Sequence, residues 1–134
     1  MLNRNQILDK LKNLNFPENQ YCVMTGAALV LHGVRSDTTD IDIGCTSKLF
    51  KELLHRGFEL IEKESFEAIV IDGCIEIFED WVPEKIELIE GIPVADINSI
   101  RQYKERLGRD KDIRDIELID KFLEQKTNYK LSQI

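Results

Sequence analysis

The chain has 134 residues, of which 43% are hydrophobic and 32% charged, and it carries a net charge of −7. A chain of this length fits one compact domain over residues 1–134, and its composition is typical of proteins that fold unaided. The negative charge argues against extended nucleic-acid binding, which depends on many Lys and Arg contacts to phosphate. No apolar run is long enough to span a membrane, and the N-terminus is too polar for a secretory signal, so we expect a cytoplasmic protein without membrane association.

The first part of the chain predicts alternating helices and strands. Leucine and isoleucine recur at helical spacing in residues 3–15 and predict an amphipathic helix. The apolar run 21–25 then predicts a short buried strand, which ends at Gly26. Residues 27–33 are rich in helix formers and predict a helix that begins directly on this glycine. Residues 39–44, "TDIDIG", alternate with period two, which is typical of a strand.

The second part predicts a hairpin and further helices. Ser47 is expected to cap the next helix. Two β-rich runs joined by Asp72 and Gly73 predict a hairpin, because Asp-Gly is a strong turn signal. Further strands are expected within residues 85–95, followed by two C-terminal helices, with fraying from residue 127 onward. We therefore predict an α/β (α+β) domain with a mixed β-sheet flanked by helices.

Cysteine and histidine usage argues against a disulfide framework or a zinc site. The three cysteines, Cys22, Cys45 and Cys74, are odd in number, widely spaced and set among apolar neighbours. We expect them to be reduced residues of the core. The two histidines lie far apart in the chain, which also argues against a histidine-rich metal site.

Two aspartates, Asp40 and Asp42, alternate with isoleucines in the predicted strand. Residues two apart in a strand point to the same face, so the two carboxylates would lie side by side while Ile41 and Ile43 face the core. Close carboxylates repel each other, and a hard divalent cation relieves that repulsion. Mg²⁺ is often held by one or two carboxylates and leaves its other positions to water and phosphates. The alternation therefore predicts a site for metal and phosphate.

Gly26 and Glu76 extend this prediction. A glycine between a strand and a helix lets a phosphate approach the backbone, where the helix N-terminus supplies N–H groups and a positive dipole end. Glu76 is flanked by Ile75 and Ile77 and faces away from both, so we expect a third carboxylate beside the two aspartates. The other candidate acid, Asp72, is better explained by the turn.

Together these features resemble the nucleotidyltransferase superfamily, which has the DNA polymerase beta-like fold. The chain is most similar to the minimal bacterial branch of AbiEii-like and MNT-like proteins. The branch pattern "GG.A...HG..R.T.DIDI" is matched by Gly26, Ala27, Ala28, His32, Gly33, Arg35, Thr38 or Thr39, Asp40 and Asp42. The pattern "K....R.KD..D" is matched by Lys104, Arg109, Lys111, Asp112 and Asp115. The matches span roughly residues 20–120, which we take as the core of the domain.

The resemblance implies transfer of a nucleoside monophosphate from an NTP, with ATP favoured, to an acceptor hydroxyl with release of pyrophosphate. It implies a two-metal Mg²⁺ site held by Asp40, Asp42 and Glu76, which would also be the catalytic residues, with Glu76 helping to deprotonate the acceptor. The residues that it assigns to nucleotide binding are Thr25, Gly26, Ala27, Arg35, Thr39, Lys104, Arg109 and Lys111. Ala27 departs from the usual Gly or Ser, so only backbone N–H groups would contact phosphate there.

Several residues near these motifs have a second interpretation. We interpret His32 as a packing residue, because phosphoryl transfer on metals needs no histidine. Arg35 either reaches the phosphates or pairs with Asp37. Three alternative roles are considered for Asp112: it is part of the nucleotide site, it caps a helix, or it orients a basic residue. Trp81 either stacks on a base or packs at the end of a loop, and packing is the favoured interpretation.

Two functions of different classes follow from this sequence. The leading hypothesis is a nucleotidyltransferase acting on a small molecule or a protein, including a toxin–antitoxin role with a toxin partner. The alternative is a binding module that kept the fold and lost the chemistry, such as an antitoxin acting by contact. Templated polymerisation is disfavoured, because the chain is acidic and has no room for another nucleic-acid domain. A homo-oligomer would close the cleft of so small a domain.

Overall fold

The computed structural model describes residues 1–62 and 64–133. Its helices are α1 (Arg4–Leu14), α2 (Thr25–His32), α3 (Ser47–His55), α4 (Ile97–Leu107) and α5 (Asp110–Ser132), with a short 3₁₀ turn at Glu18–Gln20. Its strands are β1 (Leu2–Asn3), β2 (Tyr21–Met24), β3 (Asp37–Thr38), β4 (Ile41–Cys45), β5 (Leu60–Glu62), β6 (Glu67–Ile71), β7 (Ile75–Glu79), β8 (Ile86–Ile89) and β9 (Ile92–Ala95). Among the helices of this described part, none has the length and apolar character needed to cross a membrane.

Seven strands form one mixed sheet in the order β5-β6-β7-β4-β2-β9-β8. The central strand β4 runs antiparallel to β2 and parallel to β7, and β2 runs parallel to β9. On one side β7 forms a hairpin with β6, which also pairs with the edge strand β5, and on the other side β9 forms a hairpin with the edge strand β8. A separate two-stranded ladder pairs β1 with β3. The sequence-based prediction of a mixed sheet flanked by helices is confirmed.

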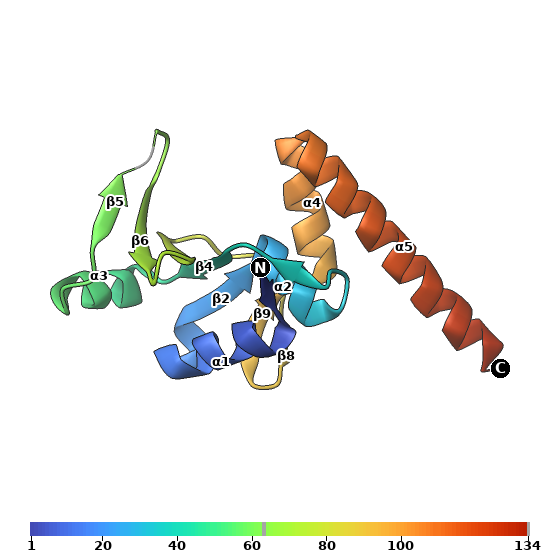
Figure 1. The fold of residues 1–134 in the computed structure, drawn as a ribbon, viewed down its shortest axis with the longest axis horizontal. Coiled ribbons are helices and arrows are strands. Elements are labelled where there is room, and N and C mark those ends of the chain that lie inside the picture. Colours follow the sequence, from blue (N-terminus) through green and yellow to red (C-terminus); the bar gives the residue numbers. More distant parts are fainter. Residues whose placement is uncertain (63, 134) are drawn as a thin grey trace.

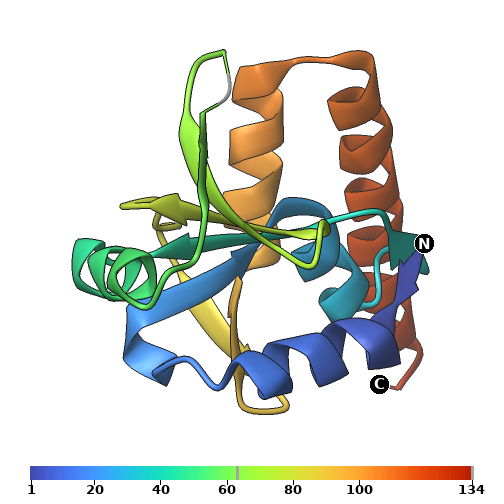
Figure 2. The same cartoon turned by 60° about the vertical axis from the view of Figure 1, so that its left-hand side comes forward.

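The helices surround the sheet unequally (Figures 1 and 2). α4 and α5 lie side by side as a helical hairpin at one end of the molecule, and α3 lies at the other end. The last turns of α5 extend away from the sheet in Figure 1. Apolar side chains of the central strands fill the core, and the fully buried ones include Val23, Ile41, Ile43, Ile77 and Val94. This burial is the main stabilising contribution, at about 25 cal/mol for each Å² removed from water.

Local signals explain where the helices begin and end. The Asn3 side chain accepts a hydrogen bond from the Gln6 backbone N–H and begins α1, and Asp96 caps α4 in the same way. Gly33 ends α2 with a φ of 87°, a conformation that favours glycine. The cap of α3 is Thr46, so the prediction for Ser47 is wrong by one residue.

Three further predictions need correction. The helix expected to begin on Gly26 begins at Thr25, one residue earlier. The strands β1, β3 and β5 were not predicted, because two or three residues are too few for a periodic pattern. Fraying from residue 127 is wrong as far as Ser132, where α5 ends, and residue 134 lies outside the described residues.

The cysteines are free thiols, as expected from the sequence. Cys22 and Cys45 are buried and Cys74 is partly buried. Burial raises the pKa of the Cys22 and Cys45 thiols to about 12, with nearby Glu79 and Asp80 adding to the effect at Cys45. Both therefore stay protonated and act as small apolar core residues.

Candidate active site

Three acids gather around the central strand, and we call Asp40, Asp42 and Glu76 the acid row. Asp42 on β4 is in register with Glu76 on β7, and side chains at paired positions point to the same face of a sheet. Asp40 directly precedes β4 and is exposed. Ile41 and Ile43 are fully buried on the opposite face, as the alternation predicts.

The carboxyl pKa of Asp42 is raised above its ordinary value. Burial raises the pKa of its carboxyl, a hydrogen bond from Thr25 opposes that rise, and the negative charges of Glu76 and Asp40 add to it. The positive charge of Lys104 lowers the pKa of Asp42. The three acids are thus close enough to repel one another, and they lie within the field of a lysine from α4.

The turn between β2 and α2 contacts the acid row directly. The Thr25 hydroxyl donates a 2.7 Å hydrogen bond to Oδ2 of Asp42. Thr25 has a φ of 47°, which is an unfavourable conformation for a β-branched residue. Such strain is held in place by its surroundings and is typical of functional sites.

Gly26 and Ala27 follow at the start of α2. A Cβ atom on Gly26 would lie 2.8 Å from Oγ1 of Thr38 and 3.4 Å from a guanidinium nitrogen of Arg35. Gly26 is therefore required by close packing against β3 and Arg35, whatever it binds. The Ala27 side chain is fully buried in the core, so any contribution of Ala27 to binding would come from its backbone.

The donor chemistry of the acid row suits Mg²⁺. Among the described residues, no group of three or more His, Cys, Asp or Glu side chains is close enough to hold a metal ion. Mg²⁺ needs only one or two carboxylates when water and phosphates complete its shell. Burial raises the pKa of Asp42 most, the charges of Glu76 and Asp40 raise it further, and a cation would offset both effects. Asp42 together with one neighbouring carboxylate of the row therefore suits this ion, whereas the three carboxylates do not form a single three-ligand group in the part of the chain that the structure describes.

A second group of charges lies where α4 and α5 meet α2, and we call it the ion cluster. It consists of three basic and two acidic side chains: Arg35, Lys104, Arg109, Asp112 and Asp115. Nζ of Lys104 lies 2.8 Å from Asp115 and 3.5 Å from Asp112, and the lysine side chain is only 7% exposed. Arg35 lies 3.5 Å from Asp115. Phosphate and Asp37 were the partners predicted for it from the sequence, and Asp115 was not among them.

Arg109 and Asp112 form the outer part of the ion cluster. The guanidinium donates to both carboxylate oxygens of Asp112, at 2.7 and 3.2 Å, and the Arg109 backbone N–H donates to the same carboxylate. The hydrogen bond from the Arg109 side chain holds the pKa of Asp112 below its usual value. Asp112 thus orients a basic residue, one of the roles considered for it.

The remaining predicted residues lie at the edge of the site. Lys111 is exposed in the first turn of α5. Thr39 is also exposed, and its hydroxyl donates to the Asp40 carboxylate at 3.3 Å. His32 is structural, as predicted: its Nε2 lies 2.7 Å from the carbonyl oxygen of Ala95 and ties α2 to β9.

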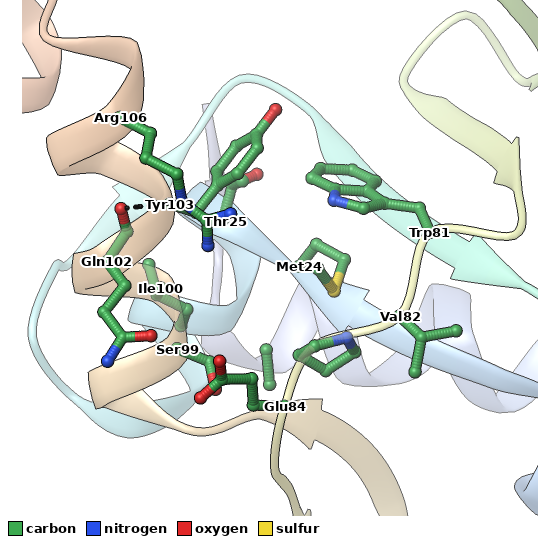
Figure 3. Close-up of a pocket in the computed structure, with 12 residues that line it drawn as sticks. Met24, Thr25, Trp81, Val82, Glu84, Ser99, Ile100, Gln102, Tyr103 and Arg106 are labelled. Atoms are coloured by element: carbon green, nitrogen blue, oxygen red, sulfur yellow. Dashed lines mark hydrogen bonds between the residues drawn. The ribbon is translucent and has the colours of Figure 1, made fainter.

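A pocket of about 390 Å³ opens next to Thr25. Figure 3 shows Trp81 and Tyr103 above Met24, with Thr25 beside Tyr103. The Trp81 and Tyr103 ring centroids are 5.3 Å apart. This volume lies in the range of small-molecule pockets, roughly 300–1,000 Å³. The pocket therefore extends the site from the acid row toward α4.

Sequence reasoning missed the structural role of Asp115 and the contribution of Tyr103. Asp112 and Asp115 are three residues apart and so share one face of a helix, which is a signal for a common partner. That partner, Lys104, is on another helix, and the sequence pattern does not show how the two helices pack. Tyr103 has an ordinary helical spacing that predicts packing alone.

Neither a protein-family model nor a curated protein matches this chain. Two solved structures are similar to it. ANT(2")-Ia in complex with adenylyl-2"-tobramycin is 16% identical with a TM-score of 0.57, and the match covers 89% of this chain and 86% of that one. A protein from Thermotoga maritima assigned as a nucleotidyltransferase is 23% identical with a TM-score of 0.52, and the match covers 90% of each chain. The chain therefore has the fold of the nucleotidyltransferases.

Proposed function

We propose that the protein is a Mg²⁺-dependent nucleotidyltransferase that moves a nucleoside monophosphate from an NTP, with ATP favoured, to a hydroxyl group. The observation that carries this proposal is the acid row: Asp42 and Glu76 in register on neighbouring strands with Asp40 beside them. The fold likeness supports it, since one similar structure holds an adenylylated small molecule. Thr25 and the N-terminus of α2 adjoin the row, where phosphates would lie.

In this proposal Asp40, Asp42 and Glu76 hold the metal. These residues would hold Mg²⁺, which would supply positive charge to offset the negative charge that develops on the phosphates during transfer. Glu76 faces the same side as Asp42 and is the candidate to accept the proton of the acceptor hydroxyl. Thr25 positions Asp42 through its hydrogen bond, which uses the single proton of its hydroxyl.

The ion cluster would supply positive charge from the other side. Lys104 already acts on Asp42 electrostatically, so it lies close enough to influence a phosphate held there. Arg109 is half exposed and is the cation of the cluster that solvent reaches most readily. We propose that Lys104 fixes the local potential while Arg109 contacts the nucleotide or the leaving pyrophosphate.

We propose a small molecule or a protein as the acceptor, with a toxin of a toxin–antitoxin pair as one protein of that class. A homo-oligomer is also part of this proposal, because a second subunit would cover the open side of so small a site. The net charge of −7 is in agreement with a nucleotide rather than an extended nucleic acid as the ligand.

A second candidate function is a binding module without chemistry. One observation favours it: Lys104 and Arg109, both expected to bind phosphate, are each engaged by acidic partners. If these pairs persisted with nucleotide present, little positive charge would remain for a triphosphate. The protein would then act by contact with a partner, such as a toxin.

Pyrophosphate release separates the two functions. Wild-type protein, ATP labelled at the α-phosphate and Mg²⁺ are incubated with small hydroxyl compounds or a protein acceptor, and both released pyrophosphate and transferred label are measured. We expect release from wild type and none from a variant with Asp40→Asn and Asp42→Asn. The matched control is Asp72→Asn, an exposed acid in the β6–β7 turn, which should behave as wild type. Equal release by all three proteins would contradict the assignment of the acid row.

A further inference from the structure

The pocket beside Thr25 has aromatic walls that come from two different parts of the chain. Trp81 comes from the segment after β7, and Tyr103 comes from the middle of α4. Their rings touch at a tilt of 54°, and both residues are only partly buried, so each keeps accessible surface. In Figure 3 the two rings lie next to each other above Met24 and form one aromatic wall of the opening. We call this cavity the Trp81–Tyr103 pocket.

The backbone holds Trp81 firmly over the sheet. A Cβ atom on Gly44 would lie 1.8 Å from the carbonyl oxygen of Trp81, so only a glycine permits the chain to cross β4 there. The Asp80 backbone N–H also donates to the carbonyl of Cys45 at 2.8 Å. Phe78 packs edge-on against the indole ring. Trp81 is thus a preorganised wall of the pocket rather than a side chain at the end of a mobile loop.

The chemistry of the walls selects one kind of ligand. The apolar walls come from Met24, Val82, Pro83 and Ile100 together with the two aromatic rings. The charged groups of the lining are one carboxylate, Glu84, and one guanidinium, Arg106. A polycation would need several carboxylates, and two aromatic rings with an apolar surround give a flat surface for stacking, so this lining suits an uncharged, flat ring with polar edges.

The position of the pocket connects it with the phosphate end of the site. Thr25 lines the pocket and also bonds to Asp42, so the two regions share a residue. Burial raises the pKa of the Tyr103 hydroxyl, the positive charge of Arg109 lowers it and the negative charge of Asp42 raises it. Tyr103 therefore lies within the electrostatic reach of both the acid row and the ion cluster.

We propose that the Trp81–Tyr103 pocket binds the planar base of the nucleotide by stacking against Trp81 and Tyr103. This proposal rests on the proposed function, because it places the base while the acid row holds the phosphates. It reverses the interpretation of Trp81 favoured by the sequence alone. Gln102 and Ser99 at the lining provide polar groups for the edge of the ring.

The test uses Trp81 itself, because it is the single tryptophan of the chain. Its fluorescence is followed during titrations with the four ribonucleosides, with ATP and with tripolyphosphate, each with Mg²⁺, and N-acetyltryptophanamide corrects for light absorbed by the bases. We expect saturable quenching by at least one ribonucleoside. Tripolyphosphate has no ring to stack, so it should leave the Trp81 emission unchanged, while calorimetry should still detect its binding.

Two variants separate stacking from folding. Tyr103→Leu removes one aromatic wall but keeps an apolar side chain, and it should weaken nucleoside and ATP binding about tenfold while tripolyphosphate binding stays unchanged. Tyr129→Leu on the exposed end of α5 is the matched control and should bind as wild type. Thermal unfolding of each variant shows whether the fold is kept, and the wild-type titrations need no variant.

The outcomes distinguish this proposal from the proposed function. Calorimetric ATP binding without any change in Trp81 emission, and unchanged in Tyr103→Leu, would overturn the base pocket and leave the nucleotidyltransferase proposal standing. Quenching by a ribonucleoside without metal-dependent ATP binding would support the pocket and count against the enzyme. A protein that responds to neither nucleosides nor ATP would overturn both.

Discussion

The acid row and the ion cluster contain aspartates in opposite electrostatic situations. Burial and the like charges of Glu76 and Asp40 raise the pKa of Asp42. At Asp112, the hydrogen bond from Arg109 lowers the pKa, and the charge of Lys104 acts in the same direction. The surroundings thus disfavour the charged form of the carboxyl group at Asp42 and favour it at Asp112.

This difference separates charges that stabilise the fold from charges that repel one another. Lys104 is buried between Asp112 and Asp115 and joins α4 to α5, so its removal would leave buried charge behind. The acid row concentrates negative charge beside a strained Thr25 and gains nothing for the fold by doing so. Repulsion of this kind is typical of a site that binds a cation. We therefore propose the acid row as the functional region and the ion cluster as its structural support.

The largest expected effect comes from the acid row. Asp42→Asn removes the central ligand of the proposed metal and should lower nucleotidyl transfer roughly a thousandfold, equivalent to about 4 kcal/mol. Its melting temperature should match or exceed that of wild type, because the variant loses a repelled, mostly buried charge. Transfer assays and thermal unfolding check the two parts. A clear fall in melting temperature would mean that Asp42 is structural.

The ion cluster should show the reverse pattern. Lys104→Met keeps the length of the side chain but leaves Asp112 and Asp115 without their shared cation, and should cost about 3 kcal/mol of unfolding free energy. Lys111→Met, at an exposed position of α5, is the matched control and should stay within about 0.5 kcal/mol of wild type. Urea unfolding measures both. Equal losses in the two variants would contradict the structural role of Lys104.

A smaller effect separates packing from binding at Gly26. Gly26→Ala should cost about 1 kcal/mol, because the overlap with Thr38 outweighs the better helix propensity of alanine. Adding Thr38→Ala removes that overlap, so the double variant should recover stability relative to the sum of the single changes. Urea unfolding of wild type, of Gly26→Ala, of Thr38→Ala and of the double variant completes this double-mutant cycle. Strict additivity would show that Thr38 does not impose the glycine.

The smallest effects are opposite pH dependences. The folded pKa of Asp112 is lowered, so its stabilising contribution is full above the unfolded value of about 3.8 and is lost as pH falls through the folded value. The folded pKa of Asp42 is raised, so wild type loses stability as pH rises from about 3.8 through that value.

The variants Asp112→Asn and Asp42→Asn, each compared with wild type, report how the contribution of each aspartate to the unfolding free energy changes with pH. The deficit of Asp112→Asn in unfolding free energy should shrink as pH falls below about 3.8, because protonation of the unfolded carboxyl reduces the advantage of the ionised carboxylate in the folded protein. The relative stability of Asp42→Asn should grow as pH rises above about 4. Urea unfolding between pH 3 and pH 7 measures both series. Two slopes of the same sign would contradict the comparison.

The acid row could be predicted because it depends on local alternation. Ile41 and Ile43 mark the core face, which places Asp42 on the other face, and the same reasoning applies to Glu76 between Ile75 and Ile77. Their pairing in register follows once the two strands are neighbours. The turn at Asp72 and Gly73 was predicted for the same reason, because a turn signal acts within a few residues.

The ion cluster and the pocket depend on packing between distant segments. Arg35 and Asp115 are 80 residues apart in the chain, and neither has a local feature that identifies the other as its partner. Lys104 and Arg109 were predicted as phosphate ligands, a role that stays a prediction, while their contacts with aspartates became visible only when α4 and α5 were placed together. The contact of Gly44 with Trp81 likewise needs the whole fold.

The most direct test of the central claim is calorimetric titration with ATP, with and without Mg²⁺, of wild type and of the variant carrying Asp40→Asn and Asp42→Asn. We predict binding to wild type that requires Mg²⁺ and is lost in the variant, while both proteins unfold at similar temperatures. Metal-independent binding that is the same in both proteins, or no binding by wild type at millimolar ATP, would contradict the assignment of the acid row as a metal and nucleotide site.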